Sequence, residues 1–490
     1  MVKRFNPDKR RRPKVDDHFG DWKWREALAE SMVPMIGKLY RNGIRLLMYG
    51  RPLVNCSAIE IMKLHRFVRE VEGNELSELE TYPVIEQISK MKLMPCEIDL
   101  GEVVVHLLDN DKLDPIKHVK SMLKEQVRTK RSHPLRPKDI VLYGFGRIGR
   151  ILTRILVSET GPGVNWRLRA VVVRDSGNTE DLIKRASLLR NDSVHGTFPG
   201  TIRVNRKNNS LIVNGNEIVF IYGNDPKKVD YKKHGIKKAT VIDNTGVWRD
   251  EDGLKMHIKN SSVERVVLTA PGKGKIKNIV YGVNDQKISE DDKILGAASC
   301  TTNAIVPALK VVDDNFKILS GHIETVHAYT NDQNLIDNYH TSDRRGRSAA
   351  LNLVITDTGA AKAISGVLPE LKGKLTANAI RVPTPNVSLA IMHLNVKKGV
   401  SVEDLNQCFR NAAFHSGLRT TIDYSNSLDA VSSDFYSNEF ACVFDSQATI
   451  SNFNNITIYC WYDNEYGYSR QVARLLNKAL GINLVRYPKQ

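Results

Sequence analysis

Hydrophobic residues in the first third of the chain recur at helical spacing. Over residues 24–40 the apolar positions lie three and four apart, at Leu28, Met32, Met35, Ile36 and Leu39. This spacing places them on one face of a helix, and the same pattern predicts helices over 59–71, 84–91 and 115–127. Alternation typical of strands is almost absent before residue 138, so we expect this part to be helical.

The pattern changes at Asp139. Short β-rich runs alternate with helical stretches, and we expect strands over residues 140–143, 168–173, 240–243, 265–268 and 293–296. Strands alternating with helices indicate a parallel, doubly wound sheet. After Cys300 a helical stretch is followed by longer alternating segments at 318–327 and 387–396. Those segments favour a second domain, in which one face of a sheet packs on helices.

The composition agrees with a multidomain globular chain. With 490 residues, the chain is long enough for about three structural units. Hydrophobic residues make up 41% and charged residues 26%, close to the average for soluble proteins, and no apolar run approaches the roughly 18 residues of a membrane span. We therefore expect no membrane insertion. Residues 128–138 carry two prolines and a dense charge run, which predicts a linker.

Net charge and cysteine usage limit the partners and the cellular location that we expect for the protein. Lys and Arg number 72 against 55 Asp and Glu, a net charge of +17, which favours anionic partners. A basic tail lies within the first fourteen residues, where lysines and arginines predominate and no apolar leader is present. The six cysteines show no CxxC spacing and the histidines are not clustered, so we expect no metal site. The expected location is the cytoplasm, where thiols stay reduced.

A glycine motif follows the first expected strand of the second part. Gly144, Gly146 and Gly149 have GxGxxG spacing and open a helical pattern. Gly144 permits a tight turn, Gly146 lets a pyrophosphate approach the backbone, and Gly149 lets the helix pack close to the strand. The helix N-terminus then faces the phosphates. The motif predicts dinucleotide binding.

An acidic residue closes the next expected strand. Asp175 lies 26 residues beyond Gly149, and its carboxylate can accept hydrogen bonds from the ribose hydroxyls of NAD. The following Ser176-Gly177 is small and polar and can also admit the 2'-phosphate of NADP. Both cofactors stay open, as does the alternative that Asp175 only caps a loop.

Candidate chemistry lies further along the chain. In Ser299-Cys300-Thr301-Thr302-Asn303 a thiol stands where a strand gives way to a helix, and a helix N-terminus stabilises a thiolate. His327 ends a strand-like run that follows. Cys300 is therefore a candidate nucleophile and His327 its candidate base.

Five ordered motifs now bear on the family. The chain resembles phosphorylating glyceraldehyde-3-phosphate dehydrogenase from about Asp139 to the C-terminus, whereas residues 1–138 lie outside the resemblance. The motifs that carry it are SCTTN at 299–303, HAYT at 327–330, TGAAKA at 358–363, RVPTPNVS at 381–388 and WYDNEYGY at 461–468.

The resemblance implies a reaction in glycolysis or gluconeogenesis. Cys300 would attack the aldehyde of glyceraldehyde 3-phosphate with His327 as base, hydride would pass to the nicotinamide, and a thioester would form. Inorganic phosphate would then release 1,3-bisphosphoglycerate. The backbone N–H of Cys300 and His327 are the expected oxyanion stabilisers, and the imidazole is expected to keep the thiol ionised.

The resemblance also implies binding residues. The substrate phosphate is assigned to Thr330 and Arg381, with Arg345 either adding charge or solvated. The attacking phosphate is assigned to four residues: Ser299, Thr301, Thr358 and Gly359. Asn464 is the expected partner of the nicotinamide amide, and the other cofactor positions are Phe145, Arg147, Ile148, Thr245 and Thr269.

The implied architecture has three parts and a homotetrameric assembly. A helical extension with its linker covers residues 1–138, a dinucleotide-binding domain covers 139–300 and is completed by a C-terminal helix in 465–490, and a catalytic domain covers 301–464. The fold class is therefore α/β plus α+β, with a doubly wound parallel sheet, a mostly antiparallel sheet and an α-helical extension before them. The loop 330–352 resembles the one that reaches a neighbouring subunit.

Departures from the family pattern keep alternatives open. Tyr143 replaces an asparagine, Asn224 stands where an arginine often lies near the adenine, and residues 338–340 lack the proline typical of strict NAD enzymes. NADP use is thus an alternative to NAD. Erythrose-4-phosphate dehydrogenase is the nearest enzyme alternative. For residues 1–138, nucleic-acid binding or regulation competes with a packing or assembly role.

Overall fold

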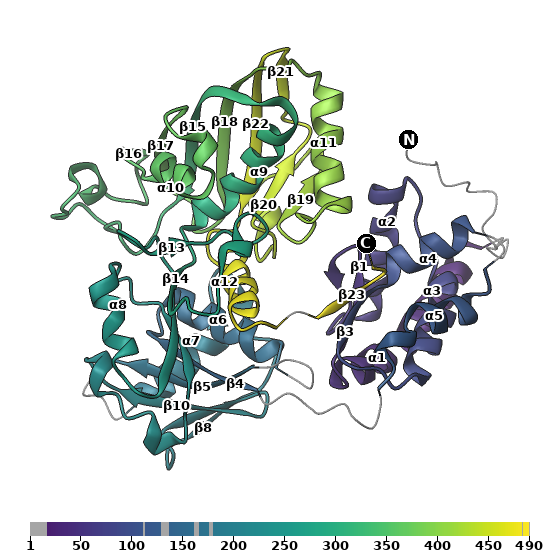
Figure 1. Ribbon diagram of the computed structural model, residues 1–490, viewed down its shortest axis with the longest axis horizontal. Coiled ribbons are helices and arrows are strands. Elements are labelled where there is room, and N and C mark those ends of the chain that lie inside the picture. Colours follow the sequence, from purple (N-terminus) through teal and green to yellow (C-terminus); the bar gives the residue numbers. More distant parts are fainter. Residues whose placement is uncertain are drawn as a thin grey trace. The chain divides into compact units, whose positions relative to one another are not determined.

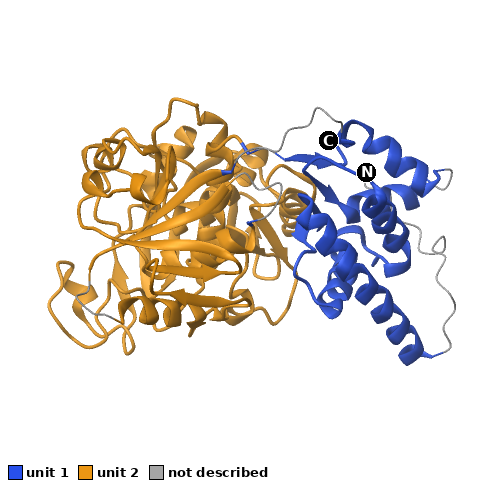
Figure 2. Cartoon of the chain, turned by 90° about the horizontal axis from the view of Figure 1, so that it is seen from below, with its two compact units in different colours: residues 1–137, 160–165, 482–490 blue, residues 138–159, 166–481 orange. Residues whose placement is uncertain are grey.

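The computed structural model describes residues 17–110, 113–128, 137–160, 166–175, 180–482 and 484–489. It divides into two compact units (Figure 2). The N-terminal unit comprises residues 1–137, 160–165 and 482–490, and the main unit comprises 138–159 and 166–481. The basic tail, most of the expected linker and Ser176-Gly177 lie outside the described residues.

The expected helices are present in the N-terminal unit. Ser57 caps the second of them through a capping box with Glu60, and Gly73 ends it in the left-handed conformation, with φ 73°. One helix, α4, was not expected, because its short apolar run has no clear period; six of its ten residues are buried. The helices are α1 (His18–Arg41), α2 (Ala58–Glu72), α3 (Glu78–Lys90), α4 (Leu100–Asp109) and α5 (Pro115–Met122).

The N-terminal unit also contains a four-stranded sheet that the hydrophobic pattern did not reveal. Its strands are short and mostly buried, so they show no alternation of polar and apolar residues. Three strands are parallel, and the last of them comes from the C-terminus (Figure 1). The order is β2 (Arg51–Pro52), β1 (Ile44–Met48), β3 (Cys96–Asp99) and β23 (Val485–Tyr487).

The C-terminal segment therefore differs from the expected single helix over 465–490. Helix α12 (Tyr466–Ala479) ends early, and residues 482–490 belong to the N-terminal unit. One buried carboxylate ties β23 to the other strands, because Asp99 accepts hydrogen bonds from the backbone N–H groups of Tyr49 and Gly50, both at 2.8 Å. Its Oδ2 also lies 2.7 Å from Nη2 of Arg486 on β23.

The first half of the main unit is the expected doubly wound sheet. Its nine strands have the order β13-β14-β12-β11-β4-β5-β10-β9-β8, parallel except for the β8–β10 edge. They are β4 (Lys138–Tyr143), β5 (Trp166–Val173), β8 (Ile202–Asn205), β9 (Ser210–Val213), β10 (Asn216–Tyr222), β11 (Ala239–Asp243), β12 (Val263–Leu268), β13 (Lys277–Asn278) and β14 (Ile294–Gly296). Its helices are α6 (Arg147–Ser158), α7 (Asp181–Arg190) and α8 (Glu251–Ile258), and a small ribbon is formed by β6 (Asn191–Asp192) and β7 (Gly196–Thr197).

The second half of the main unit is the expected, mostly antiparallel sheet. The order is β16-β17-β15-β18-β22-β20-β19, with β21 paired to β22. The strands are β15 (Ile318–Ala328), β16 (Val354–Thr356), β17 (Leu375–Val382), β18 (Ser388–Val396), β19 (Ile422–Ser425), β20 (Cys442–Asp445), β21 (Ile450–Asn452) and β22 (Asn455–Tyr462). Its helices are α9 (Cys300–Phe316), α10 (Ala360–Val367) and α11 (Val402–His415).

Helix α12 returns to the first half of the main unit, where Ala473 packs on Ile151 and Ile155 of α6.

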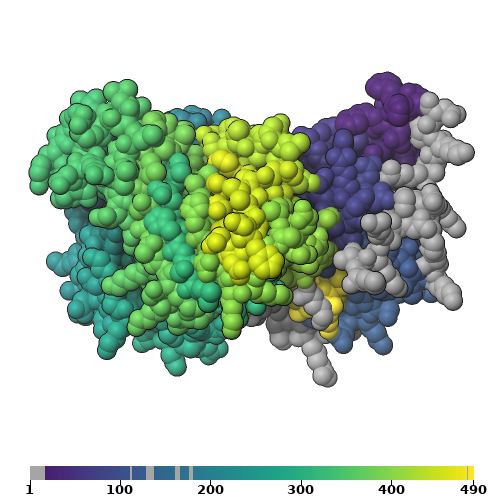
Figure 3. Space-filling model, turned by 90° about the horizontal axis from the view of Figure 1, so that it is seen from above, coloured from purple at the N-terminus to yellow at the C-terminus, as the bar shows by residue number. Residues whose placement is uncertain are grey.

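Side chains from the second half of the main unit lie next to one another on the face drawn in Figure 3, where they are coloured green to yellow. No helix among the described residues combines the length and the apolar character needed to cross a bilayer.

Candidate active site

Cys300 is the first residue of helix α9, just past the end of strand β14. Ala298 adopts φ 55°, a left-handed conformation that turns the chain sharply between the two elements. Ser299 then caps the helix, because its hydroxyl accepts a hydrogen bond of 3.0 Å from the N–H of Thr302. This local geometry puts the thiol at the positive end of the helix dipole.

His327 lies opposite the thiol near the end of β15. Its Nε2 is 3.7 Å from Sγ of Cys300, and its Nδ1 is 2.7 Å from the carbonyl oxygen of Ala328. Nδ1 also lies 3.1 Å from Nη1 of Arg381, which can only donate. The shorter contact with the carbonyl oxygen, which can only accept, favours the proton on Nδ1 and an Nε2 lone pair that faces the sulfur. The imidazole is therefore placed to accept the thiol proton.

Arg381 is the next residue of the site, and strand register places it. It pairs with His327 across the parallel strands β15 and β17. Nη1 of Arg381 lies 3.0 Å from the Ala328 carbonyl oxygen and 3.5 Å from Oγ1 of Thr330. Its Nε is buried and has no partner among the described residues. A guanidinium that contacts both His327 and Thr330 is placed to bind an anionic substrate group.

One cavity of about 270 Å³ brings the predicted chemistry together. Eight of the predicted residues line it, and Thr330 lies beside it on Arg381. Seven further lining residues were not predicted, and the acidic Asp357 is among them. The predicted residues are Ser299, Cys300, Thr301, His327, Arg345, Thr358, Gly359 and Arg381; the others are Pro271, Thr302, Thr325, Asp357, Ala360, Ala363 and Ala379.

The structure also shows which arginine of residues 344–347 faces the cavity. Arg345 lines it and is held by Asp332, at 2.7 Å from Nη1, and by the Thr356 hydroxyl, at 3.0 Å from Nε. Arg347 instead pairs with Asp337 at the surface. The reading of Arg345 as a purely solvated charge is therefore wrong.

Burial shifts the protonation equilibria of the Cys300–His327 pair. Burial raises the pKa of the Cys300 thiol, although the charge of Arg381 partly opposes this shift. Burial, with the repulsion of Arg381, lowers the pKa of His327 to about 3. Burial therefore opposes the expected ion pair, because desolvation disfavours both the thiolate and the imidazolium.

The glycine turn has the geometry of a pyrophosphate cradle. Gly144 adopts φ 102°, which an L side chain rarely does, and a Cβ on Gly149 would lie 2.5 Å from the carbonyl oxygen of Gly144. A Cβ on Gly146 would meet nothing within 4 Å. Gly146 also begins α6 without a side-chain cap, so free backbone donors face open space where a phosphate fits.

A buried carboxylate organises the two predicted threonines. Oδ1 of Asp243 accepts hydrogen bonds from the N–H and hydroxyl of Thr245, at 2.8 and 2.7 Å. Its backbone oxygen accepts from Thr269 at 3.1 Å, and its Oδ2 lies 3.1 Å from Nε2 of the buried His257. Sequence reasoning missed Asp243 and His257, because a strand-end carboxylate and an isolated histidine carry no motif.

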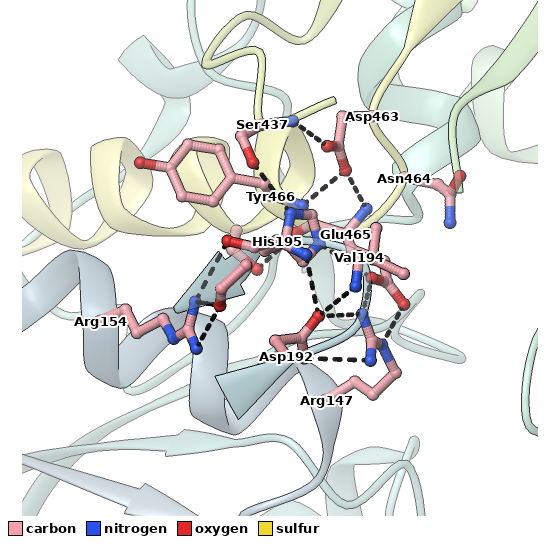
Figure 4. A network of polar contacts seen from close by, with 12 residues as sticks. Arg147, Arg154, Asp192, Val194, His195, Ser437, Asp463, Asn464, Glu465 and Tyr466 are labelled. Carbon is pink, nitrogen blue, oxygen red and sulfur yellow. Dashed lines mark hydrogen bonds and ion pairs between the residues drawn. The ribbon is translucent and has the colours of Figure 1, made fainter. Parts of the chain in front are cut away.

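Two other predicted cofactor residues are engaged within the protein. The Phe145 ring is buried against Phe220, with centroids 5.1 Å apart. The guanidinium of Arg147 pairs with Asp192 and Glu465 (Figure 4). Their side chains therefore shape the turn, and only their backbone is left for a cofactor. Ile148 is half-buried in the same helical turn.

Figure 4 shows the network around Glu465 beside the predicted nicotinamide residue. His195 bridges Glu465 and Ser437 through its two ring nitrogens, each at 3.0 Å. The neighbouring Asn464 is buried, and its Oδ1 accepts a hydrogen bond of 2.9 Å from Ser388. That bond leaves the Asn464 amide N–H₂ as a donor for a carboxamide.

Asp175, the predicted partner of the ribose hydroxyls, is exposed and lies just after the end of β5.

Comparison with known proteins agrees with this geometry. The family model of the glyceraldehyde 3-phosphate dehydrogenase NAD-binding domain matches residues 138–251, and that of the C-terminal domain matches 299–464. The chain belongs to the glyceraldehyde-3-phosphate dehydrogenase family. It is therefore an oxidoreductase with an NAD(P)-binding domain, and the expected fold class of these two domains, with helices in the part before them, is confirmed.

Three relatives illustrate the range of similarity. A glyceraldehyde-3-phosphate dehydrogenase-like protein of Pseudomonas aeruginosa is 53% identical over 94% of this chain and 100% of its own length. Glyceraldehyde-3-phosphate dehydrogenase 2 of Bacillus subtilis is 39% identical over 69% of this chain and 95% of its own. The Zymomonas mobilis glyceraldehyde-3-phosphate dehydrogenase is 36% identical over 68% and 96%. The first of these relatives shares the N-terminal extension, because 94% coverage requires it.

Proposed function

We propose that this protein catalyses the phosphorylating oxidation of glyceraldehyde 3-phosphate to 1,3-bisphosphoglycerate with NAD(P). The supporting observation is a single cavity lined by Cys300, His327 and Arg381, in which Sγ of Cys300 lies 3.7 Å from Nε2 of His327. A nucleophile, its base and an anion donor are the three groups that acyl transfer from a phosphorylated aldehyde needs.

His327 starts the reaction as a base. The imidazole is neutral near pH 7, so Nε2 can accept the thiol proton as sulfur attacks the aldehyde carbon. Burial and the charge of Arg381 lower the pKa of His327 and weaken it as a base before substrate binds. The cationic imidazole and the Cys300 N–H at the start of α9 then stabilise the oxyanion of the thiohemiacetal. Bound cofactor supplies the hydride acceptor, and the chain retains a thioester on Cys300.

The anion donors divide between two phosphates. Arg381, with Thr330 beside it, binds the phosphate of the aldehyde, because its guanidinium is a planar donor in the same cavity. The hydroxyl and backbone donors of Ser299, Thr301 and Thr358 orient the inorganic phosphate that attacks the thioester. Substrate phosphate at Arg381 also offsets the charge that depresses the pKa of His327, which favours proton transfer from the thiol.

A kinetic comparison tests this proposal. Initial rates are measured with glyceraldehyde 3-phosphate and with erythrose 4-phosphate, each with NAD and with NADP, in the presence and absence of inorganic phosphate. The proposal requires sustained turnover of glyceraldehyde 3-phosphate that depends on phosphate. A higher kcat/KM for erythrose 4-phosphate would assign the chain to that alternative, and turnover independent of phosphate would exclude a phosphorylating enzyme.

We further propose a homotetramer. Residues 329–355 expose large apolar side chains, and three of them, Leu335, Tyr339 and Leu351, are 77%, 87% and 83% exposed. Apolar side chains this exposed in one segment are typical of an interface. Sedimentation equilibrium of the full chain tests the assembly; a monomer at micromolar concentration would contradict it.

A further inference from the structure

One acidic residue lines a cavity that otherwise suits anions. Of the residues that line it, all of them within the described chain, Asp357 alone is acidic. It follows strand β16 and directly precedes Thr358 and Gly359, the pair assigned to the attacking phosphate. A negative charge beside a proposed phosphate site opposes the binding of phosphate.

The fixed charges of the lining leave little excess to overcome that opposition. The lining residues carry two guanidinium groups, those of Arg345 and Arg381, and one carboxylate, that of Asp357. Arg345 is already paired with Asp332, at 2.7 Å, and Arg381 is assigned to the phosphate of the aldehyde. The attacking phosphate therefore meets hydroxyl and backbone donors together with the uncompensated charge of Asp357.

We propose that Asp357 is a specificity-determining residue, which weakens the binding of inorganic phosphate and biases the cavity toward acyl acceptors that carry less negative charge. The inference rests on the proposed function, because it concerns the acyl-transfer step. In that step a phosphate oxygen bonds to the acyl carbon, the carbon–sulfur bond breaks, and Cys300 leaves as a thiolate. No electrons are exchanged with another molecule.

The test compares Asp357→Asn, Asp357→Ser and Asp357→Glu in the full-length chain. Asp357 is exposed, so its charge is partly screened, and we expect removal of the charge to lower the KM for phosphate by about threefold to tenfold. The KM for the aldehyde should change less than twofold. Asp357→Glu restores the charge and should restore the wild-type KM. Glu264→Gln removes an exposed charge on β12 outside the cavity and is the matched control.

A second readout does not depend on turnover. Inorganic phosphate should protect Cys300 from iodoacetamide, and the concentration for half-protection should fall about threefold to tenfold in Asp357→Asn and Asp357→Ser, but not in Asp357→Glu or Glu264→Gln. The difference should shrink in 0.5 M KCl, because salt screens an exposed charge.

The two readouts separate this inference from the proposed function. Unchanged half-protection in both neutral variants, or a shift that salt leaves intact, would overturn the role of Asp357. Absence of phosphate-dependent turnover in the wild-type chain would instead overturn the proposed function, while the protection assay still decides whether Asp357 opposes phosphate.

Discussion

The last nine residues should be needed for the N-terminal unit to fold. Removing residues 482–490 takes strand β23 from the edge of the sheet, although the main unit keeps helix α12. This deletion contrasts with removal of residues 1–138, after which we expect the main unit to fold and bind dinucleotide. The two deletions together show which unit the C-terminus serves.

The structure gives the size of the effect. Tyr487 is 2% exposed, and burial of a large aromatic side chain contributes roughly 2 to 3 kcal/mol. Loss of Arg486 leaves the carboxylate of Asp99, which is fully buried, without its cation, at a cost of about 3 to 5 kcal/mol. The total, about 5 to 8 kcal/mol, is comparable to the whole stability of a small domain, roughly 5 to 15 kcal/mol.

Hydrogen exchange measured by mass spectrometry reads each unit separately. We expect helices α1, α2 and α3 to lose protection in the truncated chain, while α9 and β15 exchange as in the full-length protein. Arg486→Met should reproduce part of the loss. Lys489→Ala removes a surface ion pair with Glu125 and an ammonium 5.8 Å from the centroid of the Tyr487 ring, and it should change protection little. Retained protection of α1–α3 in the truncated chain would refute the assignment of β23 to this unit.

Three further predictions concern the main unit. Arg381→Ala should lower kcat/KM for glyceraldehyde 3-phosphate by roughly tenfold to a hundredfold and affect unphosphorylated glyceraldehyde less; equal losses on both aldehydes would make Arg381 structural. The pKa of His327 is lower in the folded chain than in the unfolded chain, so the free energy of unfolding should fall as pH drops from about 6.5 toward 3. The difference between the urea midpoints at pH 7 and pH 5 should be smaller in His327→Asn than in the wild type, and an equal difference would contradict the shift. Asp243→Ala should weaken dinucleotide binding by about tenfold, because the N–H and the hydroxyl of Thr245 lose the one oxygen that accepts both hydrogen bonds; unchanged fluorescence titrations would exclude this positioning role.

The sequence predicted the main unit well because its signals are local. Strand β4, the turn at Gly144 and helix α6 follow one another, so period, turn chemistry and helix start are readable in one stretch. The sheet of the N-terminal unit escaped for the opposite reason. Its strand β23 lies almost four hundred residues from β3, and no local pattern can indicate such a pairing.

The candidate site shows the same division. Cys300, His327 and Arg381 stand in recognisable motifs, and the structure brings all three to one cavity. Their protonation was not predictable, since the pKa of His327 depends on how deeply the fold buries the ring and on Arg381 across the strand pair. Asp357 was missed because nothing in its immediate sequence indicates that it lines the cavity.

The central claim is that Cys300 carries the acyl group, and trapping that group tests it most directly. The full-length protein is mixed with NAD and glyceraldehyde 3-phosphate without inorganic phosphate, quenched in acid, digested and analysed by mass spectrometry. We predict a burst of one NADH per subunit and a phosphoglyceroyl adduct on the peptide that contains Cys300, both absent in Cys300→Ser, with the adduct lost when phosphate is added before the quench. A full burst without an adduct at Cys300, or an adduct that persists in Cys300→Ser, would contradict the account.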